Sequence, residues 1–169
     1  MDAAQRRWLL TNALLVTAGI NVILNALPAW VAARDLDNVP LWTVPLIGGT
    51  GLYTDTLGTL LILPFVTTLL CTTAVWHDRR RGRLPPLRLL PGRIAGLAAL
   101  PPRRLPRAVV VSLATTSLLA GPAAAALAAS APEGLDSGAF IVYKTALGVC
   151  LGVVVTPLIA LRAMADRVD

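Results

Sequence analysis

Four long apolar runs, separated by shorter polar segments, dominate the sequence. They cover approximately residues 8–30, 55–76, 107–129 and 139–161. Each run has about 20 residues or more, the length at which a helix crosses a hydrocarbon core of about 30 Å. The alternation that is typical of membrane strands is absent, and backbone groups in lipid must be paired within their own segment. The pattern predicts an all-α integral membrane protein with four transmembrane helices, in a single domain over residues 1–169.

The composition supports a membrane protein and excludes several other classes. Hydrophobic residues make up 56% of the chain and charged residues 14%, whereas soluble domains have about 25% charged residues. Cys71 and Cys150 lie inside apolar runs without a CxxC motif, so we expect neither a redox pair nor a thiolate metal site. One histidine and scattered acids are too few for a hydrolytic metal centre, and no phosphate-binding glycine motif is present. We therefore expect no metal and no cofactor.

Basic residues are concentrated in segments that four membrane crossings put on the same side. Between residues 74 and 110 the sequence has nine arginines and a single acid, Asp78. Four more arginines lie near the chain ends: Arg6, Arg7, Arg162 and Arg167. Thirteen of the fifteen lysines and arginines thus share one side, and cytoplasmic loops carry such an excess. We predict that both termini and the loop over residues 77–106 are cytoplasmic.

The net charge of +6 indicates contact with membrane lipids rather than with nucleic acid. Arginines at a membrane edge set topology and bind anionic headgroups. Residues 87–100 are mostly apolar, carry Arg88 and Arg93, and are interrupted by Pro91 and Gly92. We predict a short interfacial helix there. The bias toward Ala, Arg, Leu and Pro is typical of bacterial genomes rich in G and C, so we expect a bacterial plasma membrane.

Polar residues inside the apolar runs are informative because each must find a partner in hydrocarbon. Thr17, Asn21 and Asn25 recur at a spacing of four and form one stripe on the first helix. Such a stripe either bonds to a neighbouring helix or lines a path for a solute. A second stripe on the fourth helix consists of Lys144, Gly148, Gly152 and Thr156. Its two glycines form a GxxxG pair, which lets another helix approach closely.

Lys144 and Asp55 are candidates for a charged pair. Lys144 lies about five residues inside its run, so its long stem either reaches the headgroups or brings the ammonium to a counter-ion. Asp55 begins the second run on the same side of the membrane, where it can cap the helix and also pair with Lys144. Thr59 follows Asp55 by one turn on the same face.

Depth in the membrane places five polar residues from three helices in one layer, in the outer half. These candidate ligand- or ion-binding residues are Asn21, Asn25, Asp55, Thr59 and Lys144. The outer connection over residues 34–51 ends in the sequence GGTG and joins the same layer. Intramembrane charges with polar neighbours indicate a functional site. Spacing alone leaves open whether the five side chains converge.

These features favour a transporter or channel for a small solute or ion. Four helices enclose a path poorly, so this hypothesis requires a homo-oligomer, in the simplest case a dimer. The alternative is a non-catalytic accessory or lipid-binding subunit, in which the polar stripes hold helices together. A lipid-modifying enzyme is favoured least, because Asp55 would have only Lys144 as a catalytic partner. We therefore assign no catalytic residue.

Overall fold

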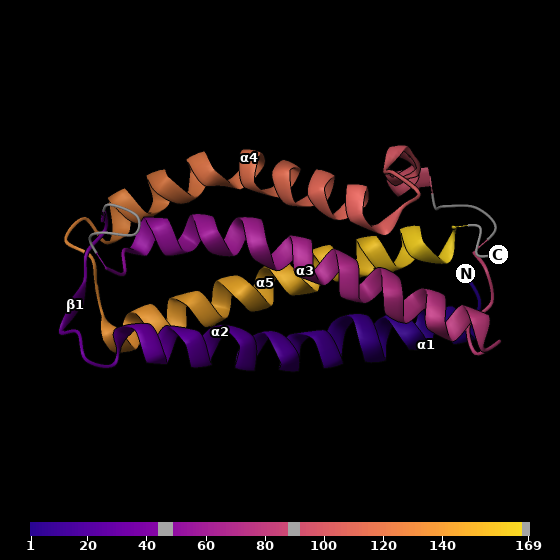
Figure 1. Ribbon diagram of the computed structural model, residues 1–169, viewed down its shortest axis with the longest axis horizontal. Helices are drawn as coiled ribbons and strands as arrows, with labels where there is room; N and C mark the ends of the chain where they lie inside the picture. Colours follow the sequence, from indigo (N-terminus) through magenta and orange to yellow (C-terminus); the bar gives the residue numbers. More distant parts are fainter. Residues whose placement is uncertain (44–48, 88–91, 167–169) are drawn as a thin grey trace.

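The computed structural model describes residues 1–43, 49–87 and 92–166, and helices dominate it (Figure 1). Its elements are α1 (Ala3–Trp8), η1 (Leu9–Val16), α2 (Thr17–Ala33), β1 (Asn38–Val39), α3 (Leu52–Arg80), η2 (Gly92–Ala99), α4 (Arg104–Ser130), β2 (Leu135–Asp136) and α5 (Ser137–Met164). Within the described residues, the helical stretches long and apolar enough to cross a membrane are Ala3–Ala33, Leu52–Arg80, Arg104–Ser130 and Ser137–Met164. The prediction of an all-helical chain with four such helices is confirmed. Each helix extends beyond the apolar run that predicted it.

Local sequence signals set several of the helix boundaries. Asp2 caps α1, because its carboxylate accepts from the Gln5 N–H at 2.8 Å while the Gln5 side chain accepts from the Asp2 N–H at 2.9 Å. Asp136 caps α5 by accepting from the Ala139 N–H at 2.9 Å. After α3, Gly82 adopts a φ of 68°, a left-handed conformation that favours glycine and ends the helix.

The first long helix differs from an ordinary α-helix in its middle. Residues Leu9–Val16 form a π-helix, η1, between α1 and α2. The Thr17 hydroxyl donates to the carbonyl of Asn12, five residues earlier, at 2.9 Å. π-helical turns are rare and often lie at functional sites. Here the π-helix lies immediately before the Thr17 stripe that the sequence singles out.

The helices are packed side by side in the order α2, α5, α3, α4. α5 packs against both α2 and α3, and α4 packs against α3. Figure 1 shows α5 crossing behind α3, from a place between α2 and α3 near the strands to the side of α3 that faces α4 at the other end. α5 is accordingly the most buried of the long helices, and α4 is the least buried. α2 and α3 are therefore held together mainly by their shared contacts with α5.

The end of the bundle that holds β1 and β2 is called the β end. There the two strands pair antiparallel, with Asn38 opposite Asp136 and Val39 opposite Leu135. Gly134, at a φ of 102°, lies so close to the strand that an added Cβ would be 2.2 Å from the Val39 carbonyl oxygen. Only glycine fits there, so Gly134 allows the two connections to join.

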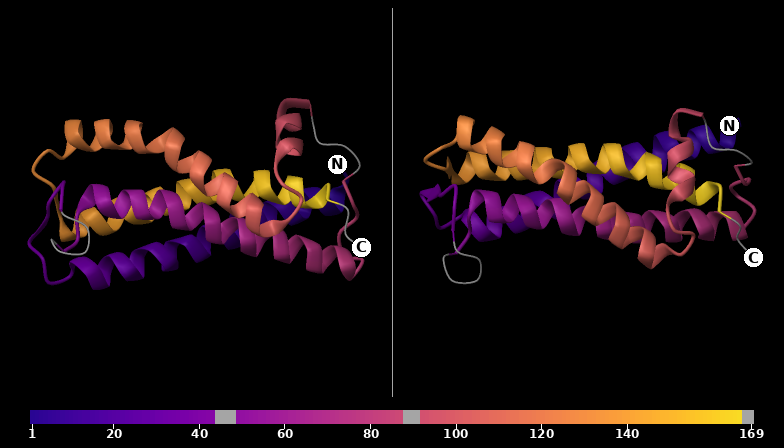
Figure 2. Two further views of the ribbon diagram at one scale, coloured as in Figure 1. Left: turned by 45° about the horizontal axis from the view of Figure 1, so that its top comes forward. Right: turned by 90° about the horizontal axis from the view of Figure 1, so that it is seen from above.

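The opposite end, where Asp2 and Asp166 lie, is called the terminal end. The Leu87 N–H donates to the Met164 carbonyl at 2.9 Å, which holds the connection after α3 against the end of α5. The predicted helix over 87–100 corresponds to a short 3-10 helix, η2, which runs across the long axis of the bundle (Figure 2). Residues 88–91 of that prediction, residues 44–48 of the outer connection, and Arg167 lie outside the described residues.

Candidate functional site

A groove of about 900 Å³ runs between α2 and α3. Its lining extends from Trp8 and Asp78 at the terminal end to Gly49 and Gly51 at the β end. On α3 alone it passes from Asp55 to Asp78, a rise of about 35 Å at 1.5 Å per residue. That length exceeds a hydrocarbon core of about 30 Å. The groove therefore follows the helices far enough to reach both faces of a bilayer.

Three helical stretches form the walls of the groove. The first long helix and α3 form its two sides, and α5 forms its back through Lys144 and Thr156. No lining residue comes from α4. In the described part of the chain, the side opposite α5 therefore has no wall.

Asp55 and Lys144 form an ion pair inside this groove. The Lys144 ammonium donates to Asp55 Oδ1. The Lys144 side chain is only 13% exposed and that of Asp55 only 18% exposed. Lys144 Nζ also lies 5.9 Å from the centroid of the Phe140 ring, within range of a cation–π contact. The pair is thus largely withdrawn from solvent. Asp55 Oδ2 is buried and has no hydrogen-bond partner among the described residues.

This geometry decides between the interpretations that the sequence left open. The N-cap of α3 is Gly51, so Asp55 lies within the first turn and does not cap the helix through its side chain. The helix begins earlier than the apolar run because Gly51 is extended and Leu52 starts the first turn. Lys144 is directed toward Asp55 and pairs with it. The acid still lies at the positive end of the helix dipole, where a negative charge is favourable.

Thr59 lies beside the pair and lines the same groove. Its hydroxyl donates to the Asp55 carbonyl at 2.9 Å, one turn earlier. The neighbouring Thr56 hydroxyl donates to the Leu52 carbonyl at 2.7 Å and lies 2.8 Å from the Tyr143 hydroxyl of α5. A second polar link between α3 and α5 therefore supports the charged one.

Asn21 and Asn25 are placed against the glycines of α5. A Cβ added at Gly148 would lie 2.2 Å from Asn25 Nδ2, and one at Gly152 would lie 2.3 Å from Asn21 Nδ2. The Asn25 amide also donates to the Asn21 carbonyl at 2.8 Å. The GxxxG pair thus accommodates polar side chains rather than a bare backbone.

Thr17 and Thr156, which end the two stripes on the side away from Asp55 and Lys144, lie near the same contact. Thr17 Cγ2 would lie 3.4 Å from a Cβ at Gly152, and the Asn21 amide donates to the Thr17 carbonyl at 2.9 Å. Thr156 lines the groove from α5. All five candidate binding residues line this one groove: Asn21, Asn25, Asp55, Thr59 and Lys144. Asn21 and Asn25 are only 4% exposed each, so they serve helix packing as well.

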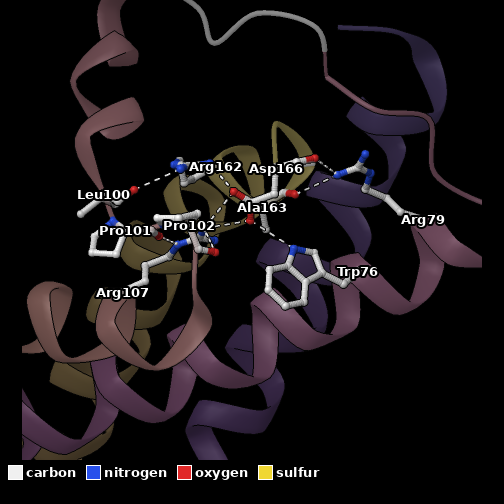
Figure 3. A network of polar contacts seen from close by, with 9 residues as sticks. All are labelled: Trp76, Arg79, Leu100, Pro101, Pro102, Arg107, Arg162, Ala163 and Asp166. Atoms are coloured by element: carbon white, nitrogen blue, oxygen red, sulfur yellow. Dashed lines mark hydrogen bonds and ion pairs between the residues drawn. The ribbon is translucent and has the colours of Figure 1, made fainter. Parts of the chain in front are cut away.

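A second polar cluster, which the sequence analysis did not identify, lies at the terminal end (Figure 3). We call it the Asp166 cluster, and its side chains are Trp76, Arg79, Arg107, Arg162 and Asp166. The Asp166 carboxylate accepts from Arg107 Nη2 at 2.9 and 2.8 Å, from Trp76 Nε1 at 3.1 Å, and from Arg162. Arg79 donates to the Asp166 backbone carbonyl. The cluster therefore ties α3, α4 and α5 together.

Arg107 is the most deeply buried charge of the cluster. Its side chain is 0% exposed and that of Asp166 is 3% exposed. The guanidinium also donates to the carbonyls of Pro101 and Pro102, at 2.9 and 3.0 Å. These bonds fix the segment that leads into α4. A buried charge with this many partners is a structural feature, because each bond offsets part of its desolvation.

The sequence contained one signal for the Asp166 cluster. Arg162 and Asp166 are four residues apart, a spacing that suits an ion pair on a helix. Arg107 was assigned to membrane topology because a basic residue at a membrane edge commonly has that role. Its partner lies 59 positions away, a separation that no local pattern reveals.

The described residues contain no group of three or more histidines, cysteines or acids placed to hold a metal ion. The chemistry available in the groove is that of two carboxylates, Asp55 and Asp78, one ammonium, one thiol, hydroxyls and amides. Comparison with protein-family models, with curated proteins and with solved structures found no match.

Proposed function

We propose that the protein is a transporter or channel that moves a small solute or ion along the groove between α2 and α3. The observation that carries this proposal is the Asp55–Lys144 pair, which lines a groove long enough to reach both faces of a bilayer. Charges inside a membrane are costly and are typical of substrate and ion pathways. The polar site would lie in the outer half of the membrane.

Transport along this groove requires a second wall, because the side opposite α5 is open in the described chain. A homo-oligomer supplies such a wall most simply, and a dimer is the first arrangement to consider. In that arrangement the two copies face each other across their grooves.

A second candidate is a non-catalytic accessory or lipid-binding subunit. The apolar part of the lining favours it, since side chains such as Ile20, Leu24, Ile62, Leu63, Val66 and Leu70 face the groove. An acyl chain fits such a surface without a second protein wall. A lipid-modifying enzyme is favoured least, because among the described residues Asp55 would have only Lys144 as a catalytic partner.

The orientation that we propose places the terminal end in the cytoplasm of a bacterial cell, at the plasma membrane. Thirteen of fifteen basic residues belong to the segments assigned to that side. In a variant with Cys71 and Cys150 replaced by serine, a membrane-impermeant maleimide should label Asp37→Cys in intact cells and leave Arg83→Cys unlabelled. Labelling of Arg83→Cys would reverse the orientation.

The arginine-rich loop would then contact anionic headgroups. η2 runs across the bundle axis (Figure 2), as an interfacial helix must. Basic residues near an anionic surface contribute about 1 kcal/mol each. Hydrogen exchange over residues 92–100 should therefore be slower in anionic nanodiscs than in neutral ones. Equal exchange in both would argue against lipid contact.

Filling the groove tests the transport proposal directly. Gly58 lines the groove and has no atom within 4 Å of an added Cβ, so Gly58→Leu should fold and block the path. Gly121 on α4 has equally open space and lies away from the groove, so Gly121→Leu is the matched control. The measurement is solute entry into liposomes that contain purified protein, with KCl, glycerol and leucine as probes.

We expect at least one probe to enter faster than into protein-free liposomes, and Gly58→Leu to slow that entry several-fold. Gly121→Leu should leave it unchanged. If no probe enters, or if both variants behave alike, the transport proposal is wrong. Lipid that copurifies in a native mass spectrum would then favour the lipid-binding subunit.

A further inference from the structure

Near its β end, the groove presents two opposite charges beside a strip of apolar surface. These charges are Asp55 and Lys144. Ile62 follows Asp55 by seven residues, two helical turns along the same face of α3, and it lines the groove together with Leu24 and Leu63. A ligand that uses the whole of this region must therefore carry charge at one end and apolar surface at the other.

A simple ion fits this site poorly. A cation that took Asp55 would leave Lys144, only 13% exposed, without its carboxylate. An anion that took Lys144 would leave Asp55 without its ammonium. Breaking a buried pair by removing one partner is strongly unfavourable, because a charge is left uncompensated. A zwitterion avoids this, since it brings a partner for each member.

The pair also has unused hydrogen-bonding capacity. An ammonium carries three donors and a carboxylate accepts through two oxygens. Among the described residues, the Lys144 ammonium makes one hydrogen bond, and Asp55 Oδ2 has no partner. Because each carboxylate oxygen has two lone pairs, a ligand ammonium can donate to Asp55 from the groove while a ligand carboxylate or phosphate accepts from Lys144. The four charges then alternate in sign, so none is left unpaired.

Space for the ligand lies next to the pair. Gly58, one turn below Asp55, has no atom within 4 Å of an added Cβ. Gly51 and Thr54 line the groove just before Asp55 in the sequence. The opening beside Asp55 therefore continues directly into the apolar strip at Ile62.

From these contacts we propose that the groove binds an amphipathic zwitterion, with its ammonium on Asp55, its anionic oxygen on Lys144 and its apolar part along Leu24, Ile62 and Leu63. This inference rests on the proposed function and names the substrate class of the same site. Two sources share the chemistry: a free apolar amino acid, and a phospholipid headgroup with a primary ammonium. The open side of the groove admits either one.

The test compares ligands that differ only in charge. Purified protein is titrated with leucine, with leucinamide, which lacks the anion, and with N-acetyl-leucine, which lacks the cation. In a parallel arm, native mass spectrometry measures retention of phosphatidylethanolamine against phosphatidylglycerol, which has no ammonium. The variants are the double change Asp55→Asn with Lys144→Met, and a control, Arg34→Gln with Asp35→Asn, which removes the exposed pair at the β end.

In one of the two arms, the zwitterion should bind at least about tenfold more tightly than its single-charge analogues, a difference of about 1.4 kcal/mol. The groove double variant should lose that preference, and the surface control should keep it. The arm that responds identifies the source. Equal binding of zwitterion and single-charge analogues in both arms, or an unchanged preference in the groove double variant, would overturn the inference.

The two proposals fail in different ways. If KCl or glycerol enters liposomes and Gly58→Leu stops it, while no zwitterion binds, transport stands and the substrate class is wrong. If a zwitterion binds with the expected preference but no probe crosses the membrane, the binding site stands and transport is wrong. The folded state of each variant is checked by its thermal unfolding in detergent.

Discussion

The two ends of the bundle each contain a largely buried acid, but the two acids differ in their number of hydrogen-bond partners. At the terminal end, Asp166 is 3% exposed and accepts from three side chains, while its backbone carbonyl accepts from a fourth. At the β end, Asp55 is 18% exposed, pairs with Lys144 alone and retains one oxygen without a partner in the described structure. Only the Asp55 pair lines the groove.

The number of hydrogen-bond partners distinguishes a charge that holds helices together from a charge that can bind a ligand. A carboxylate whose oxygens are all engaged by fixed donors gains little from a further ligand. A carboxylate with one partner and free acceptor capacity gains a hydrogen bond when a donor arrives. We therefore interpret the Asp166 cluster as a joint between helices, and the Asp55–Lys144 pair as the place where a ligand acts.

The largest expected effect is at the Asp166 cluster. Asp166→Asn should lower the free energy of unfolding by about 3–5 kcal/mol, because it leaves the fully buried Arg107 without its counter-ion. Thermal unfolding in detergent measures the loss. Asp35→Asn removes an acid whose side chain is 84% exposed and serves as the control, with little effect expected. A loss of similar size in both variants would contradict a special role for Asp166.

The next effect concerns the Asp55–Lys144 pair. Lys144→Met should lower the free energy of unfolding by about 1–3 kcal/mol, since a mostly buried carboxylate loses its cation. The double change with Asp55→Asn should recover most of that stability, because neither charge is left alone. Double-mutant analysis of thermal unfolding separates the outcomes, and additive losses would show that the two residues do not interact.

Recovery of stability should not restore function in this double variant. If the pair is the ligand site, transport and zwitterion binding remain lost although the fold has recovered. A stable double variant with full activity would make the β end structural, like the terminal end. That result would remove the difference between the two ends.

Packing of α2 on α5 should be the third most sensitive feature. Gly148→Ala places a Cβ within 2.2–2.7 Å of the Asn25 amide atoms, and Asn25 is held by its bond to the Asn21 carbonyl. Overpacking of this kind costs about 1–3 kcal/mol. Gly121→Ala meets open space and should be neutral or slightly stabilising, since alanine favours helix. Equal thermal unfolding of the two variants would argue against the close contact.

Much of the fold and part of the site followed from the sequence, for identifiable reasons. Apolar runs longer than a bilayer core leave few alternatives to helices, so the four long helices were predictable. Asp55 and Lys144 were identified because charges inside apolar runs are conspicuous. That they meet depended on how α3 and α5 pack, which a helical repeat does not determine. The Asp166 cluster was missed because its charges lie at membrane edges, where arginines commonly have another role.

The smallest expected effect is the change in stability when a buried hydroxyl without a hydrogen-bond partner is removed. Thr72 is fully buried in α3, and its hydroxyl has no hydrogen-bond partner among the described residues. Thr72→Val keeps the shape and removes an unsatisfied group, so stability should stay the same or rise by about 1 kcal/mol. Thr56→Val, on the same helix, removes a hydroxyl with two partners and should cost about 1–2 kcal/mol.

Thermal unfolding of these two valine variants completes the comparison between the ends of the bundle. Thr56 links α3 to Tyr143 near the charged pair, whereas Thr72 lies toward the terminal end, where the Asp166 cluster already holds α3. A loss at Thr72 equal to that at Thr56 would mean that its hydroxyl finds a partner in the membrane.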